Sequence, residues 1–155
     1  MEITVGIGDY KVSDKEEDFL RTYALASCIA VTVYSPAKKV AGMLHIALPE
    51  PHEGEMDINP AYYATTGIPL LINKMCLQYG CVKSDLLVHL YGGAESICKD
   101  DIFNIGRKNI HAVNKTPENL KLAIHKSEVG GRVSRTLSMN VTEGEIKVKY
   151  QSIRI

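Results

Sequence analysis

The stretch CIAVTVYSPAKKVAGMLHIAL, residues 28–48, decides the fold class of this chain. It contains two runs rich in β-branched and apolar residues, 28–34 and 40–48, separated by Ser-Pro-Ala-Lys-Lys. Such runs are typical of strands, whereas the serine, the proline and the two lysines between them are typical of a turn. The stretch therefore predicts a β-hairpin.

Further strand signals lie on both sides of this hairpin. They are alternating apolar residues or short apolar runs that end in glycine, and they predict strands over residues 3–7, 85–91, 120–124, 137–141 and 146–150. The last two flank a Glu143-Gly144 turn and form the clearest hairpin after the first. For residues 120–124 an alternative remains open, because Thr116-Pro117 is also a possible start of a short helix.

Two helices are predicted between these strands. The first begins at Asn59-Pro60 and ends at Gly80, and the second runs from Asn104 to Lys115. Pro69 lies inside the first helix and predicts a kink or break near residues 65–67. We therefore expect an α/β (α+β) fold, in which largely antiparallel β-sheet layers are covered by two substantial helices within a single domain over residues 1–155.

Composition narrows the possible functions. The chain has 18 basic and 18 acidic side chains without a basic cluster, which disfavours nucleic acid as a partner. No apolar run is long enough to insert into a membrane, and MEITVGIGDY does not resemble a signal peptide, so we expect a cytoplasmic protein. Cys76 and Cys81 lack the second pair of ligands that a zinc site needs. We expect neither a bound metal nor a disulfide.

The first hairpin carries the strongest chemical signal. If Val33 pairs with Val40, the same antiparallel register places Cys28 opposite His45, on the same face of the sheet. A thiol beside an imidazole forms a nucleophile–base pair, and an adjacent imidazolium would favour the thiolate. The hydroxyl of Thr22 could orient the histidine ring. The competing interpretation is structural: Cys28 fills space in an apolar strand, and His45 is buried against a backbone carbonyl.

The sequence around this pair resembles a known family. TYALASCIAVTVYSPAKKVAGMLHIALPE, residues 22–50, is similar to the N-terminal block of the CheD family of receptor glutamine deamidases, and Thr22, Cys28 and His45 fall on the family's catalytic positions. The resemblance extends from about Val5 to Tyr150. Further motifs recur in family order: Gly92-Gly93-Ala94, Asn104-Ile105-Gly106 with Asn109, and Gly130-Gly131 with Arg135.

Two departures from the family pattern are visible. Ala24 and Ala26 stand where the family has glycine, and alanine resists the positive φ angles that glycine tolerates. Arg107 is displaced by one position from the family's arginine, which corresponds to about a third of a helical turn. These differences bear on activity or partner choice more than on the fold.

The resemblance implies a CheD-like three-layer sandwich and hydrolysis of receptor glutamines to glutamate, with no metal or organic cofactor. Cys28 would attack the amide, His45 would transfer protons and Thr22 would orient the ring. We also expect substrate contact or loop support from Ser27, Ser134 and Arg135. The implied partners are the cytoplasmic helices of a chemoreceptor and, in some members, a CheC-type phosphatase; a monomer is the default expectation.

Two alternatives to this function stay open. One is a CheD-like adaptor that binds the receptor or the phosphatase but turns over slowly or not at all, as Ala24 and Ala26 would allow. The other is a cysteine amidohydrolase that acts on a different protein or on a small amide. Activity on free glutamine without activity on receptor helices would favour the latter.

Overall fold

The computed structural model of the chain describes residues 1–95 and 104–153. Its elements are the strands β1 (Glu2–Thr4), β2 (Asp9–Ser13), β3 (Phe19–Leu25), β4 (Ile29–Ser35), β5 (Val40–Ile46), β6 (Leu87–Gly92), β7 (Ile124–Val129), β8 (Val133–Asn140) and β9 (Ile146–Ser152), the helices α1 (Ala64–Tyr79) and α2 (Ile105–Asn119), and two short 3₁₀ helices, η1 (Pro60–Tyr62) and η2 (Lys83–Asp85).

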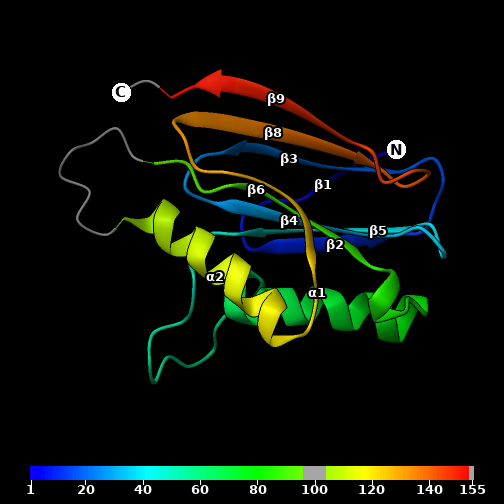
Figure 1. Ribbon diagram of the computed structural model, residues 1–155, viewed down its shortest axis with the longest axis horizontal. Coiled ribbons are helices and arrows are strands. Elements are labelled where there is room, and N and C mark those ends of the chain that lie inside the picture. Colours follow the sequence, from blue (N-terminus) through cyan, green and yellow to red (C-terminus); the bar gives the residue numbers. More distant parts are fainter. Residues whose placement is uncertain (96–103, 154–155) are drawn as a thin grey trace.

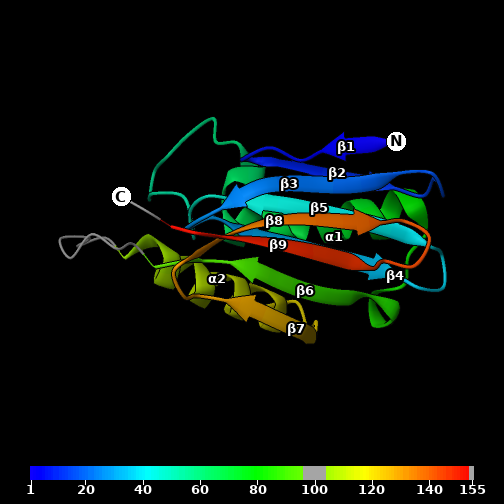
Figure 2. The same cartoon turned by 90° about the horizontal axis from the view of Figure 1, so that it is seen from above.

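The strands form two sheets that lie face to face. One has four strands in the order β1-β3-β8-β9, and the other has five in the order β2-β5-β4-β6-β7. Both helices cover the outer face of the five-stranded sheet, which gives three layers (Figures 1 and 2). Only β1 with β3 and β6 with β7 pair in parallel among the described strands. The predicted α+β class with largely antiparallel sheets is confirmed.

The predicted first hairpin, β4 and β5, forms the centre of the molecule. Every residue in both strands is buried, because the five-stranded sheet is covered on both faces. Val31 and Leu44 belong to the core shared with the helices, whereas Ala30 and Met43 belong to the core between the sheets. Burial of one such aliphatic side chain contributes about 2 kcal/mol to stability. We call the face that carries Ala30 and Met43 the inner face.

The register of this hairpin differs from the predicted one by two residues. Ser35 pairs with Val40, and Ala30, rather than Cys28, pairs with His45. The cause is a tight turn in which Lys39 adopts a left-handed conformation, with φ of 52°. A shift of two residues preserves the alternation of side chains, so the faces were predicted correctly although the pairs were not.

The helix that was predicted to begin at Asn59 is divided into two parts. Asn59 caps η1, since its Oδ1 accepts a hydrogen bond from the backbone N–H of Ala61 at 3.1 Å, and α1 then begins at Ala64. Gly80 ends α1 in a left-handed conformation, as predicted. A break near residues 65–67, one of the two expected outcomes, was wrong: α1 begins at Ala64 and runs through Pro69 without interruption. A proline removes one backbone bond, and the apolar face of α1 remains packed on the sheet on either side.

The second helix is longer than predicted. It continues through Pro117 to Asn119, and Leu122 then closes the turn by donating its N–H to the Pro117 carbonyl at 2.8 Å. The strand expected from residue 120 therefore begins only at Ile124. Neither α1 nor α2 is long and apolar enough to cross a bilayer.

The predictions for the first strand, residues 3–7, and for the last hairpin, residues 137–150, had different outcomes. The first strand stops at Thr4, because the chain turns between Gly6 and Asp9, where the Asp9 N–H donates to the Gly6 carbonyl at 3.1 Å. The hairpin of β8 and β9 is confirmed.

Candidate active site

Thr22 and His45 face each other across the gap between the two sheets. Thr22 lies on β3 and is fully buried, and His45 lies on the inner face of β5 and is 3% exposed. The Thr22 hydroxyl donates to the Val5 carbonyl oxygen at 2.7 Å and lies 2.7 Å from His45 Nδ1. Because the single hydroxyl hydrogen goes to Val5, the second contact requires Nδ1 to be the donor. The tautomer is therefore fixed, and Nε2 is the basic nitrogen.

The basic nitrogen of His45 is buried and available. Nε2 has no hydrogen-bond partner within the described part of the chain. Burial lowers the pKa of His45 to about 4, and the hydrogen bond with the Val5 backbone opposes this only in part. At neutral pH the ring is therefore uncharged and is able to accept a proton.

Cys28 comes directly before β4 and is half-buried against the core between the sheets. It lies two residues before Ala30, which pairs with His45, so its side chain is on the inner face, diagonal to the histidine. Burial raises the pKa of the Cys28 thiol, although the hydrogen bond from its own backbone N–H opposes this. Burial thus favours the neutral form of both groups, whereas the sequence suggested that an imidazolium beside Cys28 would favour the thiolate.

The backbone around Cys28 is held by three hydrogen bonds. The carbonyls of Ala26 and Cys28 accept from the N–H groups of Ala94 and Gly93, at 2.7 and 2.9 Å. The carbonyl between them, that of Ser27, accepts from the Asn109 side-chain amide at 2.9 Å. Residues 26–28, which we call the nucleophile loop, are therefore fixed by the end of β6 and by α2.

Glycine allows these segments to approach closely. Gly92 has φ of 115°, and a Cβ atom there would lie 2.2 Å from the Cys28 carbonyl oxygen. A Cβ atom on Gly106 of α2 would lie 2.3 Å from the Ala94 carbonyl oxygen. The Gly92-Gly93 motif thus serves close backbone packing around the nucleophile loop.

The three predicted supporting residues lie in different environments. Arg135 is buried, and its guanidinium donates to the carbonyls of Gly92 and Gly130 at 3.2 and 3.0 Å. Ser27 is half-buried within the nucleophile loop. Ser134 lies on the outer face of β8, since side chains alternate along a strand and its neighbour Arg135 points inward. The structure therefore brings Ser27 and Arg135, but not Ser134, to the site.

Asn109 was noted in the sequence only as part of a motif, and its contacts with the site were not predicted. Its amide also donates to the Ala47 carbonyl at 3.0 Å, two residues after His45. A signal for this role does exist, because Asn109 is a polar residue on the helix face that also carries Gly106, Ala112 and Val113, all of which are buried.

One of the two alanines that replace family glycines is strained. Ala24 has φ of 52°, and it lies in an irregularity of the β3–β8 ladder between Thr22 and Leu25. A left-handed conformation costs a residue with a Cβ atom about 1 kcal/mol. Ala26 does not have a positive φ angle. The strain therefore lies four residues before Cys28 rather than beside it.

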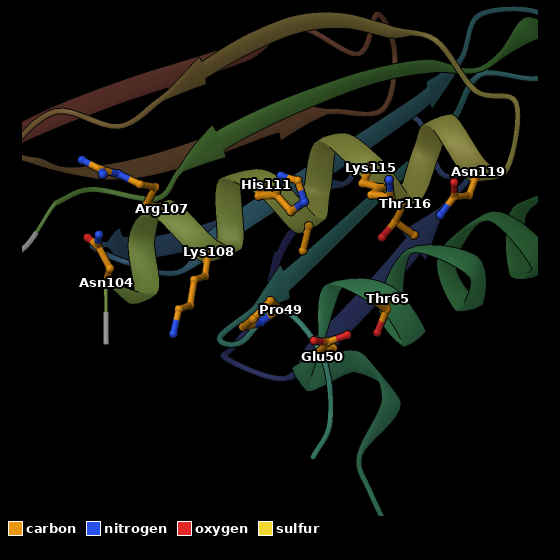
Figure 3. Close-up of a pocket in the computed structure, with 11 residues that line it drawn as sticks. Pro49, Glu50, Thr65, Asn104, Arg107, Lys108, His111, Lys115, Thr116 and Asn119 are labelled. Atoms are coloured by element: carbon orange, nitrogen blue, oxygen red, sulfur yellow. The ribbon is translucent and has the colours of Figure 1, made fainter. Parts of the chain in front are cut away.

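A groove of about 730 Å³ lies on the helical layer, away from the inner face. Arg107, Lys108 and Lys115 of α2 are among its lining residues, and Lys108 extends toward the side of the groove on which Glu50 lies (Figure 3). Arg107, whose position departs from the family pattern, is largely exposed and forms an ion pair with Glu95 at 4.0 Å. This groove is separate from the space between Thr22 and His45.

Cys28, Cys76 and Cys81 are free thiols, and Cys98 lies outside the described residues. Across residues 1–95 and 104–153, no group of three histidine, cysteine, aspartate or glutamate side chains is arranged to hold a metal ion. Among the described residues, the site brings together a buried imidazole and a half-buried thiol.

Comparison with known proteins identifies the family. A family model described as CheD chemotactic sensory transduction matches residues 47–150, about two thirds of the chain. The chain belongs to the CheD family. The family match begins after Cys28 and His45, but full-length CheD relatives extend over that region as well.

One such relative is a probable chemoreceptor glutamine deamidase CheD of Syntrophotalea carbinolica. It is 40% identical over 151 residues, which cover 95% of this chain and 93% of that protein. A protein of the same description from Pyrococcus abyssi is 36% identical over 150 residues, covering 96% and 91%. Bacterial and archaeal CheD proteins thus match this chain over nearly its whole length.

Proposed function

We propose that this CheD-family chain is a cytoplasmic deamidase that hydrolyses selected glutamine side chains of a chemoreceptor to glutamate, with Cys28 as the nucleophile. The observation that carries the proposal is the 2.7 Å contact between Thr22 Oγ1 and His45 Nδ1. It leaves the basic Nε2 buried, without a hydrogen-bond partner among the described residues, and on the same face as Cys28. The names of the full-length relatives support the same activity.

The first step begins from a neutral pair. The Cys28 Sγ attacks the carbon of the glutamine carboxamide while His45 Nε2 takes the thiol proton, so a C–S bond forms and the carbonyl electrons move onto oxygen. The low basicity of His45, with a pKa of about 4, means that the imidazolium forms only during this step. It is then a strong acid and readily gives up its proton.

In the next step this proton goes to the amide nitrogen, the C–N bond breaks and ammonia leaves, which produces a thioester on Cys28. Water then attacks the thioester carbonyl as Nε2 takes one of its protons. The C–S bond breaks, the proton returns to sulfur and glutamate is released. The net reaction consumes one water molecule and one glutamine side chain, and it requires neither a metal nor an organic cofactor.

Thr22 orients the ring throughout this cycle. Its hydroxyl accepts from Nδ1–H and is itself held by the Val5 carbonyl. A neutral hydroxyl fixes the tautomer as a carboxylate would, but it does not add a negative charge that would raise the basicity of the ring. This arrangement keeps His45 uncharged between turnovers.

The test is mass spectrometry of a receptor cytoplasmic fragment after incubation with the protein. We expect wild type to convert defined glutamines to glutamate, and Cys28→Ala to lower the rate by at least about 10³-fold, since a lost nucleophile is not replaced. The matched control is Cys76→Ala, which removes another half-buried free thiol in α1 and should leave turnover unchanged.

Persistent conversion by the Cys28→Ala variant would exclude this nucleophile. A fragment that binds wild type without any change in mass would favour the adaptor instead. Conversion of short amides alone would favour a different amidohydrolase.

A further inference from the structure

The nucleophile loop presents three successive carbonyls, and each of them is held by one donor. Two of these donors are backbone N–H groups, those of Ala94 and Gly93. The third, which holds the Ser27 carbonyl, is the side chain of Asn109. The Ser27–Cys28 peptide is thus the one peptide of the loop whose orientation depends on a side chain.

We infer that Asn109 is a positioning residue for the reaction proposed above, and that it orients the Ser27–Cys28 peptide so that the backbone N–H of Cys28 stabilises the oxyanion. The inference rests on the proposed function. It assigns to the Asn109 amide a role in the geometry of the transition state rather than in the binding of substrate.

The geometry of the Ser27–Cys28 peptide relates the contact with Asn109 to the direction of the Cys28 N–H. The Ser27–Cys28 peptide is trans, so its C=O and N–H groups point in opposite directions. Asn109 draws the Ser27 carbonyl toward α2, which turns the Cys28 N–H away from that helix. This N–H belongs to the same residue as the attacking sulfur, so it lies within one residue's length of the atom that attacks. An N–H beside the attacking atom is suitably placed for the developing oxyanion.

The surroundings of Asn109 fix its amide in a single orientation. The side chain is fully buried, and its Nδ2 donates both to Ser27 and, at 3.0 Å, to the Ala47 carbonyl. A flipped amide would place Oδ1 against two carbonyl oxygens, so the assignment of the nitrogen is determined by its partners. Gly106 allows α2 to pack against Ala94, and Asn109 lies one helical turn further along on the same face.

The second contact links the two halves of the site. Ala47 follows His45 by two residues, at the end of β5. One amide group therefore connects the loop of the nucleophile to the strand of the base. A displacement of either segment would change the separation of sulfur and Nε2, and small displacements of reacting groups have large effects on rate.

The experiment compares Asn109→Ser and Asn109→Ala with Asn114→Ala. Asn114 is a matched control, because it lies on the same helix, is exposed, and donates to the carbonyl of Ile110 on its own helix at 2.8 Å. Steady-state kinetics on the receptor fragment should show a kcat about 10²-fold lower for Asn109→Ala, the size expected for one oxyanion donor, with KM nearly unchanged. Asn109→Ser retains one hydroxyl donor and should lie between Asn109→Ala and wild type.

A second measurement separates this role from a purely structural one and does not need turnover. The rate of alkylation of Cys28 by iodoacetamide, followed by peptide mass spectrometry, gives the pH dependence of the thiol. Its midpoint should rise in both Asn109 variants, because the thiolate loses a well-oriented N–H donor. Asn114→Ala should match wild type.

An unchanged kcat, or a midpoint that does not move in folded Asn109→Ser protein, would overturn the inference. If Asn109→Ala does not fold, the serine variant alone decides the result. If wild type itself shows no deamidation, the proposed function fails, whereas the alkylation midpoints still decide whether Asn109 orients the Cys28 peptide.

Discussion

The two ends of β4 differ in how completely their buried polar groups are hydrogen-bonded. At the C-terminal end of β4, which we call the far end, Tyr34 Oη lies 2.9 Å from the carbonyl oxygens of both Val141 and Thr142. Ser35 Oγ at the same end donates to Asp85 at 2.6 Å. At the N-terminal end of β4, which we call the near end, buried polar atoms of His45, Asn109 and Arg135 lack a hydrogen-bond partner in the described part of the chain. These polar groups at the far end are thus hydrogen-bonded, whereas several buried polar atoms at the near end are not.

This difference suggests that the far end contributes mainly to stability and the near end mainly to the proposed activity. A buried polar atom without a partner costs about 1–3 kcal/mol, so the near end reduces the free energy of unfolding. In the proposed mechanism, the same missing hydrogen-bond partner leaves Nε2 of His45 able to accept the thiol proton. Variants at the near end should therefore change kcat most, whereas variants at the far end should change the free energy of unfolding and leave kcat unchanged.

The largest expected effect comes from His45→Gln. Glutamine does not act as a base, so kcat on the receptor fragment should fall by about 10³-fold or more. The variant should also change the dependence of stability on pH. The pKa of His45 is about 4 in the folded chain and about 6.5 when it is unfolded, so between these values only the unfolded chain takes up the proton.

Wild type should therefore lose up to about 3 kcal/mol of the free energy of unfolding through this group as pH falls from 6.5 to 4, and His45→Gln should not. Urea titrations of both proteins at pH 7 and pH 4.5 measure the difference, and other groups cancel in the comparison. Equal losses in the two proteins would contradict a buried neutral histidine.

Tyr34→Phe should have the converse profile at the far end. The free energy of unfolding should fall by about 1–2 kcal/mol, because two carbonyls lose their shared donor, while kcat and KM stay at the wild-type values. Urea titration and the deamidation assay measure the two quantities. Tyr23→Phe is the control, since Tyr23 is 47% exposed and, within the described chain, its hydroxyl hydrogen-bonds to the exposed Glu2. A fall in kcat for Tyr34→Phe would show that the two ends are coupled.

The smallest expected effect is that of Ala24→Gly. Glycine tolerates the left-handed conformation, so the free energy of unfolding should rise by about 1 kcal/mol. Ala26→Gly is the matched control and should be neutral or destabilising, because Ala26 has no positive φ angle. Thermal unfolding of the two variants shows which of them is the more stable. The opposite ranking would mean that the strain at Ala24 is compensated locally.

Elements with a local signal were predicted well. Both hairpins and both helices follow from turn residues and apolar runs. The register between β4 and β5 was wrong by two residues because it depends on the conformation of Lys39, which composition does not reveal. The strand expected at residue 120 was wrong because alternation of apolar residues also occurs where a helix ends in a turn.

The site was predictable only in part, for a related reason. Cys28, His45 and Thr22 are close in sequence and carry recognisable chemistry, and alternation along the strands placed the first two on one face. Asn109 and Arg135 act through backbone carbonyls of distant loops. A carbonyl acceptor has no sequence signature, so such contacts become visible only when the segments are seen together.

The separation in sequence between the nucleophile loop and its supports has a consequence for how the chain acquires activity. Asn109 lies 82 residues after Ser27, and Gly93 also follows the whole of α1. A nascent chain that has emerged only as far as β5 already holds Cys28, His45 and Thr22, but none of the groups that hold the loop. During synthesis the thiol therefore emerges before the groups that fix the loop around it, and the proposed site is completed only when β6 and α2 have folded onto the hairpin.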